Sequence, residues 1–512
     1  MTKRFYVSTP IYYVNGAPHI GHAYTSIAAD VLARFKRMDG FDVFFVTGTD
    51  EHGQKVEQAA AAAGLAPQAY ADKISRDFRD MTDAMGVSYD DWIRTTEQRH
   101  KDSCSELWKR IEAAGDIYLG HYEGWYSVRD EAFYNEDELV TLPDGTKIAV
   151  KSKAPVAWVK EPSYFFRLST FQDRLMQFYE ENPDSIGPSS GRSEVLSFVK
   201  GGLHDLSVSR TTFNWGIPVP NAPGHVMYVW LDALTNYITA AGFPDMSAPR
   251  WKFWPADVHV VGKDIIRFHA VYWHAFLMSA GLTPPKRVSS HGWWVMDGEK
   301  MSKSLGNVVE PRVLAETFGL DQIRYFLLRE KPFGADGSLN HQAIISRMNV
   351  ELANDLGNLA QRSLSLIAKN CDGKLPSRGT ATQEDASLLD AANALPNLVR
   401  AAMDRQTFHE ALEEIWKIIR AGNAYIDHQA PWALRKTDPI RMAVVLRVLV
   451  DAMRIVATLL QPFMPTSIGR MLDQLGVPPD ARLLSDLAKP LADGTQLPTP
   501  QGVFPRYVEP VV

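Results

Sequence analysis

The first 50 residues alternate between strand, loop, helix and strand, and this order limits the possible fold more than any other part of the chain. Apolar residues at 4–9 and 42–47 predict two buried strands, and 20–38 between them has the periodicity of a helix. Such an order begins a doubly wound parallel sheet, an α/β fold. Ligands of these sheets bind at the carboxyl ends of the strands. We therefore expect His19 and Asp50 to lie together at that edge.

The character of the sequence changes along the chain, which predicts several structural segments. Aromatic and turn-forming residues between about 115 and 215 are typical of short antiparallel strands inserted into the sheet. The α/β pattern then resumes, with strands expected at 226–231 and 258–261, and nearly everything after 342 has helical periodicity. The expected segments are the first half of the catalytic domain at 1–115, a β-rich insertion at 116–215, the second half of the catalytic domain with a lysine-rich loop at 216–341, and an α-helical bundle with a C-terminal tail at 342–512.

Composition indicates a folded protein with more than one core. Of the 512 residues, 45% are hydrophobic and 22% are charged, and the chain is too long for one ordinary core. Cys104 and Cys371 are the only cysteines, so a disulfide framework and a cysteine-rich metal site are excluded and a reducing compartment is favoured. The N-terminus lacks the apolar segment of a secretory signal, and the apolar segment 443–460 is interrupted by charged residues. We expect a cytoplasmic protein with no membrane span.

Two short motifs carry groups that bind phosphate. His19-Ile20-Gly21-His22 begins the first expected helix, where imidazole N–H groups and the positive helix end can face phosphate oxygens and Gly21 leaves space for a nucleotide. Lys300-Met301-Ser302-Lys303-Ser304 lies between Gly298 and Gly306, which favours a loop that closes on a ligand. Taken singly, a capping histidine and a solvated basic turn are the simpler interpretations. The presence of both motifs, in this order, favours phosphate binding.

With these motifs, the chain resembles the class I aminoacyl-tRNA synthetases, and among them the methionyl-tRNA synthetases of the bacterial type. The similarity extends over most of the chain and includes Tyr13-Val14-Asn15-Gly16, Thr49-Asp50-Glu51-His52-Gly53, Tyr228-Val229-Trp230-Leu231-Asp232-Ala233, Gly262-Lys263-Asp264-Ile265, Phe268-His269 and Pro431-Trp432. The resemblance implies a Rossmann-like catalytic domain followed by an α-helical anticodon-binding domain. It also implies that methionine and ATP give methionyl-adenylate and pyrophosphate, and that the methionyl group then passes to the 3′ end of tRNA(Met), including the initiator tRNA.

The resemblance assigns the ATP site to the two phosphate-binding motifs. The implied ATP-binding residues are His19, Gly21, His22, Lys300, Ser302 and Lys303. The histidines and lysines among them are implied to be catalytic, because cations and N–H groups fixed where charge develops lower the barrier to pyrophosphate release. We expect Mg²⁺ to accompany ATP and to be held mostly by phosphates and water.

Methionine has an uncharged side chain, so its pocket is expected to be apolar and aromatic, with polar groups for the amino-acid head. The resemblance implies that Asp50 binds the ammonium group and that Tyr13, with a backbone N–H near Ile11, approaches the sulfur. Core packing is the simpler role for any one of the aromatic residues. The positions that match the family pocket are Ile11, Tyr13, Asp50, Trp230, Ala233, Leu234, Tyr237, Ile265, His269, Tyr272 and Trp273.

A polar stripe in the helical region matches the anticodon-reading residues of the family. Asn354, Asn358 and Arg362 are spaced by four and so share one face of a helix, where such groups can read bases of an RNA loop. Trp432, after Pro431, offers an indole on which a base can stack. The resemblance implies that these five residues read the CAU anticodon; without the activation motifs, a polar helix face and a core tryptophan would be the simpler interpretation. The net charge of −6 is weak evidence against RNA binding, because a local basic face can exist on an acidic protein. No appended tRNA-binding segment follows the tail, so we expect a monomer.

Two other interpretations stay open: a class I synthetase for another amino acid, and an inactive tRNA-binding paralogue. The expected insertion is too short for the editing domain of the leucine, isoleucine and valine enzymes, and the cysteine enzyme would need a zinc–thiolate site. Intact histidines and lysines in both motifs argue against an inactive paralogue.

The insertion is expected to fold without zinc. Many methionyl enzymes carry a zinc knuckle built on Cys-x-x-Cys pairs, but here the place after Gly124-Trp125-Tyr126 reads Ser127-Val128-Arg129-Asp130. Serine and a single carboxylate cannot replace two thiolates as structural zinc ligands. We expect hydrogen bonds and aromatic packing to hold this segment instead.

Overall fold

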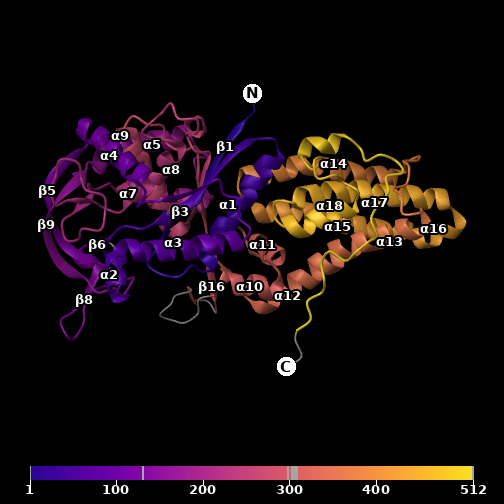
Figure 1. The fold of residues 1–512 in the computed structure, drawn as a ribbon, viewed down its shortest axis with the longest axis horizontal. Helices are drawn as coiled ribbons and strands as arrows, with labels where there is room; N and C mark the ends of the chain where they lie inside the picture. The colour runs from indigo at the N-terminus through magenta and orange to yellow at the C-terminus, as the bar shows by residue number, and fades with distance from the viewer. Residues whose placement is uncertain (1, 130–131, 297–298, 301–308, 510–512) are drawn as a thin grey trace.

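Figure 1 shows the computed structural model, which describes residues 2–129, 132–296, 299–300 and 309–509. The molecule is elongated, with the sheets at one end and the helices of the last third of the chain at the other. The expected α/β catalytic domain followed by a helical bundle is confirmed.

The catalytic domain is built on a seven-stranded sheet in which every described pairing is parallel. Strands β1 and β3 lie at its centre, flanked by β14, and the short β2 and β4 both pair with β3. The sheet order is β10 (Ile186–Gly187), β15 (Val288–His291), β14 (Val258–Gly262), β1 (Arg4–Ser8), β3 (Asp42–Asp50) and β2 (Tyr12–Tyr13), with β4 (Asp91–Arg94) beside β3.

Helix α1 (Ile20–Met38) begins and ends at the expected residues. Its backbone continues into Gly40, whose φ of +83° is accessible to glycine at no steric cost, and this ends the helix. The helix packs on β1, β3 and β14 with one face and on α3 (Pro67–Ala84) and α11 (Leu320–Arg329) with others. Buried on most sides, it is the central helix of the molecule.

The insertion contains the expected antiparallel strands. β5 (Ile117–Ser127) and β9 (Ala157–Phe166) pair along their whole length, and Trp125 packs edge-on against Trp158 with ring centres 5.3 Å apart. The range expected as insertion nevertheless holds more than β structure. Its other elements are β6 (Ala132–Tyr134), β7 (Leu139–Thr141), β8 (Lys147–Ala149), α5 (Gln172–Glu181), α6 (Ser189–Lys200), β11 (Leu206–Ser207) and β12 (Ser209–Arg210).

Strand β10 also lies within the range expected as insertion, yet it pairs parallel with β15 in the main sheet. Helices α5 and α6 flank β10 and pack against each other beside it. A strand of two residues is too short to give a periodic signal, so the sequence did not reveal the return to the sheet.

The prediction of a strand at 226–231 is wrong. Only β13 (Val226–Met227) is extended, and it pairs antiparallel with β12, outside the parallel sheet. The chain then turns, and the backbone N–H of Ala233 donates to the carbonyl of Val229 (2.7 Å) at the start of helix α7 (Trp230–Leu234). A short apolar run fits a buried strand and a buried helix equally well, which is why periodicity failed here.

The described part of the catalytic domain contains further α-helices. They are α2 (Gln54–Ala62), α4 (Gln98–Ala113), α8 (Asn236–Ala241), α9 (His274–Ser279) and α10 (Pro311–Phe318). The helical bundle consists of α12 (His341–Ser346), the π-helical segment η7 (Arg347–Gly357), α13 (Asn358–Asn370), α14 (Gln383–Asp404), α15 (Phe408–Gln429), α16 (Pro431–Thr437), α17 (Pro439–Leu460) and α18 (Pro465–Gln474).

Helix α17 runs through the centre of the bundle and is almost wholly buried. Its charged residues are paired: Arg447 contacts Asp451 at 3.1 Å, and Arg454 donates to the carbonyls of Asp486 (2.7 Å) and Lys489 (2.6 Å). No helix in the described part of the chain is long and apolar enough to cross a membrane.

The C-terminal tail folds back on the body of the protein. Val503 and Phe504 are buried, and the backbone N–H of Tyr507 donates to the side-chain oxygen of Asn349 (2.8 Å).

A buried arginine joins α1 to the bundle. Arg324 of α11 donates to Asp30 of α1 (2.6 Å), and both side chains are fully buried. The same guanidinium donates to the carbonyls of Met85 (3.1 Å), Pro462 (2.9 Å) and Phe463 (3.0 Å), the last two between α17 and α18. Its hydrogen bonds therefore reach both the catalytic domain and the bundle.

Two further ion pairs join the C-terminal end of α1 to α14. Lys36 contacts Asp404 (2.5 Å), and Asp39 contacts Arg400 through two hydrogen bonds of 2.8 and 2.9 Å. Helix α1 is thus anchored to the bundle along its second half.

Candidate active site

A cavity of about 950 Å³ opens at the carboxyl ends of the parallel strands. Ile11 follows β1, Asp50 ends β3, Gly262 ends β14 and His291 ends β15, and all four line the cavity together with His19 at the start of α1. This is the edge at which doubly wound sheets bind ligands. The expectation that His19 and Asp50 lie there is confirmed.

The first two site histidines form the N-terminal cap of α1. The Nδ1 of His19 accepts from the backbone N–H of Gly21 (3.1 Å), and the Nδ1 of His22 accepts from the backbone N–H of His19 (3.1 Å). The ring centres are 3.8 Å apart. Because Nδ1 accepts in each ring, the neutral imidazole carries its proton on Nε2. Both residues and Gly21 line the cavity, so capping and ligand binding are compatible roles.

The lysine motif begins at the edge of a small separate sheet. β17 (Glu299–Lys300) pairs antiparallel with β16 (Trp294–Met296), with Val295 opposite Lys300. β16 follows β15 along the chain, and His291 at the end of β15 lines the cavity. Ser302 and Lys303 lie outside the described residues, as does the side chain of Lys300, so their assignment to ATP stays a prediction.

The structure gathers ten of the eleven residues expected to bind methionine in the walls of the cavity. Strand pairing sets Tyr13 directly opposite Asp50, and the Trp230 ring stacks on Phe268 with ring centres 3.8 Å apart. Trp273 is the exception: it is fully buried and packs behind the cavity wall against Tyr237, with ring centres 6.0 Å apart. The ten lining residues are Ile11, Tyr13, Asp50, Trp230, Ala233, Leu234, Tyr237, Ile265, His269 and Tyr272.

Two of these residues form a hydrogen-bonded pair inside the pocket wall. The Nδ1 of His269 donates to the carbonyl of Ile265 (3.0 Å), so its Nε2 accepts from the hydroxyl of Tyr237 (2.7 Å). Burial lowers the pKa of His269 to about 4 and raises that of Tyr237 well above its usual range. The pair is therefore uncharged at neutral pH, which suits a pocket for an apolar side chain.

The cavity also has lining residues that sequence reasoning missed. Arg210 is buried, with its guanidinium 3.6 Å from the centre of the Tyr228 ring, and the indole N–H of Trp293 donates to Asp264 (3.0 Å). His291 contacts Thr25 of α1 at 2.7 Å. Arg210, Trp293 and His291 come from segments without a recognisable motif, so only the fold reveals them.

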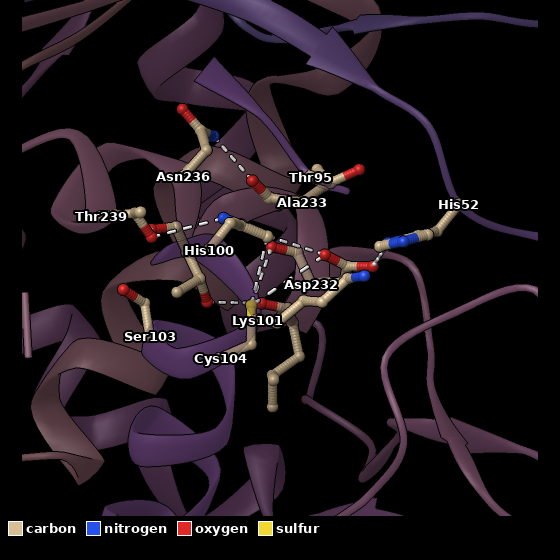
Figure 2. A network of polar contacts seen from close by, with 12 residues as sticks. His52, Thr95, His100, Lys101, Ser103, Cys104, Asp232, Ala233, Asn236 and Thr239 are labelled. Carbon is tan, nitrogen blue, oxygen red and sulfur yellow. Dashed lines mark hydrogen bonds and ion pairs between the residues drawn. The ribbon is translucent and has the colours of Figure 1, made fainter. Parts of the chain in front are cut away.

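One group of three described side chains has the donor atoms to hold a metal ion: His100, Cys104 and Asp232, whose donor atoms lie within 4.8 Å of one another. Figure 2 shows that these donors are engaged with each other and with neighbours. The Nε2 of His100 lies 2.8 Å from Asp232 and 3.2 Å from the sulfur of Cys104. Burial, followed by the negative charge of Asp232, raises the pKa of the Cys104 thiol. A protonated thiol is a poor metal ligand, so a hydrogen-bonded cluster fits these residues better.

The residues expected to read the anticodon lie in the bundle. Asn354 of η7 and Asn358 of α13 are exposed, while Arg362 is half-buried and contacts Asp427 (2.5 Å). Pro431 is buried as the first residue of α16, and Trp432 is 42% exposed. The Arg362 guanidinium lies 5.2 Å from the centre of the Trp432 indole. Figure 1 places α16 at the end of the molecule opposite β5 and β9.

Comparison with known proteins decides the family. The chain matches the model of class I tRNA synthetases (M) at residues 5–147 and 144–364, and the anticodon binding domain of methionyl tRNA ligase at 375–509. The chain belongs to the methionyl-type class I tRNA synthetases. The family inferred from the motifs is therefore confirmed.

Relatives resemble this chain along its whole length. It is 57% identical to the methionine–tRNA ligase of Mesorhizobium japonicum, over 99% of this chain and 98% of that protein, and 55% identical to that of Mycobacterium bovis, over 99% of each. Among solved structures, the methionyl-tRNA synthetase of Mycobacterium tuberculosis in complex with methionyl-adenylate is 54% identical, with a TM-score of 0.96 over 99% of this chain and 100% of that one. The apo form of the same synthetase gives a TM-score of 0.91 at 50% identity, over 100% of this chain and 99% of that chain.

Proposed function

We propose that the cavity joins methionine and ATP as methionyl-adenylate, with release of pyrophosphate, before the methionyl group passes to the 3′ end of tRNA(Met). One observation carries this proposal: an apolar pocket around Asp50 opens into the same cavity as His19 and His22 at the start of α1. A carboxylate held in the pocket can therefore meet an α-phosphate held at the helix end. Relatives named methionine–tRNA ligase and the neighbour in complex with methionyl-adenylate support the same reaction.

The methionine half of the proposed site combines one carboxylate with apolar walls. Asp50 supplies the negative charge that the ammonium group of methionine needs, at the end of a rigid strand. Tyr13 lies opposite Asp50 in the sheet, and the neutral pair of Tyr237 and His269 faces the side chain without burying a charge. Trp230 closes the wall with an aromatic ring, a surface with which a thioether makes favourable contacts.

The ATP half of the proposed site uses the positive end of α1. His19 and His22 place N–H groups at that end, where they can donate to phosphate oxygens as charge develops on pyrophosphate. Lys300 and Lys303 of the lysine motif add positive charge when ATP is bound. Mg²⁺ is expected to accompany ATP and to be held mostly by its phosphates and by water.

The bundle carries the proposed tRNA-reading surface. Asn354, Asn358 and Arg362 supply hydrogen-bonding groups for the bases of the CAU anticodon, and Trp432 beside Arg362 supplies a stacking surface. The elongator and initiator tRNA(Met) share this anticodon, so both are expected substrates. The enzyme is expected to act as a monomer.

The insertion is expected to work without zinc. Ser127 is buried at the end of β5, where many methionyl enzymes have a cysteine. Elemental analysis of chelator-washed protein tests this: zinc bound at one ion per chain contradicts the expectation, and full activity without zinc supports it.

Amino-acid-dependent exchange of pyrophosphate into ATP, measured with each of the twenty amino acids, tests the proposed function. We expect exchange with methionine and little with the others. Efficient exchange with another amino acid would favour a synthetase of different specificity, and no exchange with any would favour an inactive paralogue.

A further inference from the structure

The methionine pocket is built from two walls that are far apart in the sequence. One wall carries Asp50 at the end of β3, and the other is the short helix α7, which carries Trp230, Ala233 and Leu234. Nothing in the sequence spacing fixes the distance between these walls. A contact that joins them therefore controls the width of the pocket.

Asp232 makes such a contact. Its Oδ2 accepts a hydrogen bond from the Nδ1 of His52, two residues after Asp50, at 2.7 Å. His52 and Asp232 are 6% and 1% exposed, and they are separated by 180 residues. Asp50, His52 and Asp232 also border one small cavity of about 10 Å³. The carboxylate of Asp232 thus lies directly behind the Asp50 wall.

The second oxygen of Asp232 is held from another direction. Oδ1 accepts from the Nε2 of His100 on α4 (2.8 Å), and the Nδ1 of His100 contacts the hydroxyl of Thr239 on α8 (3.3 Å). Figure 2 shows Asp232 between the two imidazoles, with Cys104 beside His100. Two separate segments, the one after β3 that carries His52 and helix α4, therefore hold this carboxylate, and α8 contacts His100 behind it.

The geometry of α7 separates the binding face from the anchoring face. At 100° per residue, Trp230, Ala233 and Leu234 share one side of the helix and Asp232 points to the other. The residues on the first side line the large cavity, and Asp232 does not. Any movement of Asp232 must therefore carry the methionine wall with it.

The electrostatics favour a rigid contact. Burial acts to raise the pKa of Asp232, but the two imidazoles outweigh it through their charge and hydrogen bonds, and they hold that pKa below its usual range. An ionised carboxylate accepts stronger hydrogen bonds than a neutral group, and breaking them inside the protein leaves a charge without solvent.

We propose that Asp232 is a positioning residue for methionine: held between His52 and His100, it fixes helix α7 against the Asp50 wall and so sets the width of the amino-acid pocket. The inference rests on the proposed methionine-binding residues and adds to them a group that does not touch the substrate. In this proposal His52 connects the two walls, and His100 holds the carboxylate of Asp232 from helix α4.

The test is pyrophosphate exchange with KM and kcat measured separately for methionine and ATP. Asp232→Asn keeps the shape of the side chain but weakens both hydrogen bonds, and we expect KM for methionine to rise at least about tenfold while KM for ATP changes by less than about twofold. His52→Leu is also expected to raise KM for methionine. His52→Asn, whose amide nitrogen occupies about the place of Nδ1, is expected to restore most of the affinity that His52→Leu loses.

Asp385→Asn is the matched control. Asp385 is also a fully buried carboxylate held by hydrogen bonds, from Arg441 and Tyr425, but it lies on α14 in the bundle. We expect this variant to lose stability without a change in KM for methionine. A general loss of stability is thereby separated from a loss of positioning.

An unchanged KM for methionine in folded Asp232→Asn would overturn the proposal. If that variant does not fold, the His52 pair decides: equal KM values in His52→Leu and His52→Asn contradict the proposal, and rescue by asparagine supports it. Asp50→Asn distinguishes an error in the proposed methionine site from an error in the positioning role of Asp232. No effect of Asp50→Asn on KM for methionine refutes the proposed site itself, whereas an effect of Asp50→Asn without one of Asp232→Asn refutes only the positioning role.

Discussion

Gly21 has no space for a side chain. A Cβ built on it would lie 2.9 Å from the Cε1 of His19 and 3.0 Å from its Nδ1, closer than such atoms approach. A larger residue must push the imidazole away from the N–H of Gly21, which it caps. The glycine of the motif therefore keeps the histidine ring in place as well as leaving space for a nucleotide.

We predict that Gly21→Ala lowers the rate of adenylate formation by about tenfold or more, because the displaced His19 no longer faces the transition-state charge. Single-turnover adenylate formation measures this directly. Gly502→Ala is the control, since a Cβ at Gly502 meets nothing within 4 Å. Equal rates in both variants would contradict the role given to the ring position of His19.

Three buried histidines make stability depend on pH. Burial lowers the pKa values of His269, His274 and His291 to about 4 each, whereas an unfolded chain titrates near 6.5. The unfolded state therefore binds more protons between these values, and stability that is full above pH 6.5 is lost as the pH falls towards 4.

We predict that the free energy of unfolding at pH 5 is lower than at pH 7, by about 2 kcal/mol for each of these histidines. Urea unfolding at the two pH values measures the change. His274→Asn, which removes one titrating group, should reduce the difference, and His428→Asn, on an exposed side chain, should not. A larger difference in His274→Asn would show that the assignment is wrong.

At the scale of elements, the success of sequence reasoning followed the strength of the local signal. Helix α1 was predicted to the residue because His19 and Gly40 mark its two ends and its apolar face is long. The structures of segments 226–231 and 186–187 were not predicted. A few apolar residues do not distinguish a strand from a helix, and the strand with which 186–187 pairs lies far along the chain.

The site residues also differ in whether the sequence could place them. Residues inside motifs, such as Asp50 and His19, could be placed from sequence because strand ends of a parallel sheet meet at one edge. Arg210 and Trp293 could not, because single residues outside any motif carry no pattern and only the folded chain brings them to the cavity. Trp273 was placed in the wall by analogy, and the structure puts it one layer behind.

Helix α16, which carries Trp432, lies at the end of the molecule opposite the parallel sheet whose strand ends line the activation cavity (Figure 1). We predict that Trp432→Ala lowers kcat/KM for tRNA about tenfold through loss of base stacking, and leaves methionine-dependent pyrophosphate exchange unchanged. Aminoacylation and exchange assays on one preparation measure both effects. Leu398→Ala, at a 49% exposed position on α14, is the control and should change neither. An equal fall in both activities would show that Trp432 is a packing residue.

At the scale of the molecule, Arg324 joins the catalytic domain to the bundle. We predict that Arg324→Met lowers the free energy of unfolding by about 3–5 kcal/mol, because it leaves buried Asp30 and several carbonyls without their donor. Arg34→Met removes a second arginine from the same carboxylate, but its side chain is 29% exposed, so a loss of about 1 kcal/mol or less is expected. Urea unfolding of the two variants compares them, and equal losses would contradict the importance of burial.

Helix α1 connects the candidate ATP site to the bundle. Its 19 residues span about 28 Å, with the histidines at one end and the contacts to α14 at the other. For a rigid rod of this length, a rotation of about 5° about the anchored end displaces the free end by about 2 Å. A displacement of that size is enough to break a hydrogen bond to a phosphate oxygen. A rotation of α1 about its anchored end would therefore misalign the histidines, and the packing of α1 on β1, β3 and β14 opposes such a rotation.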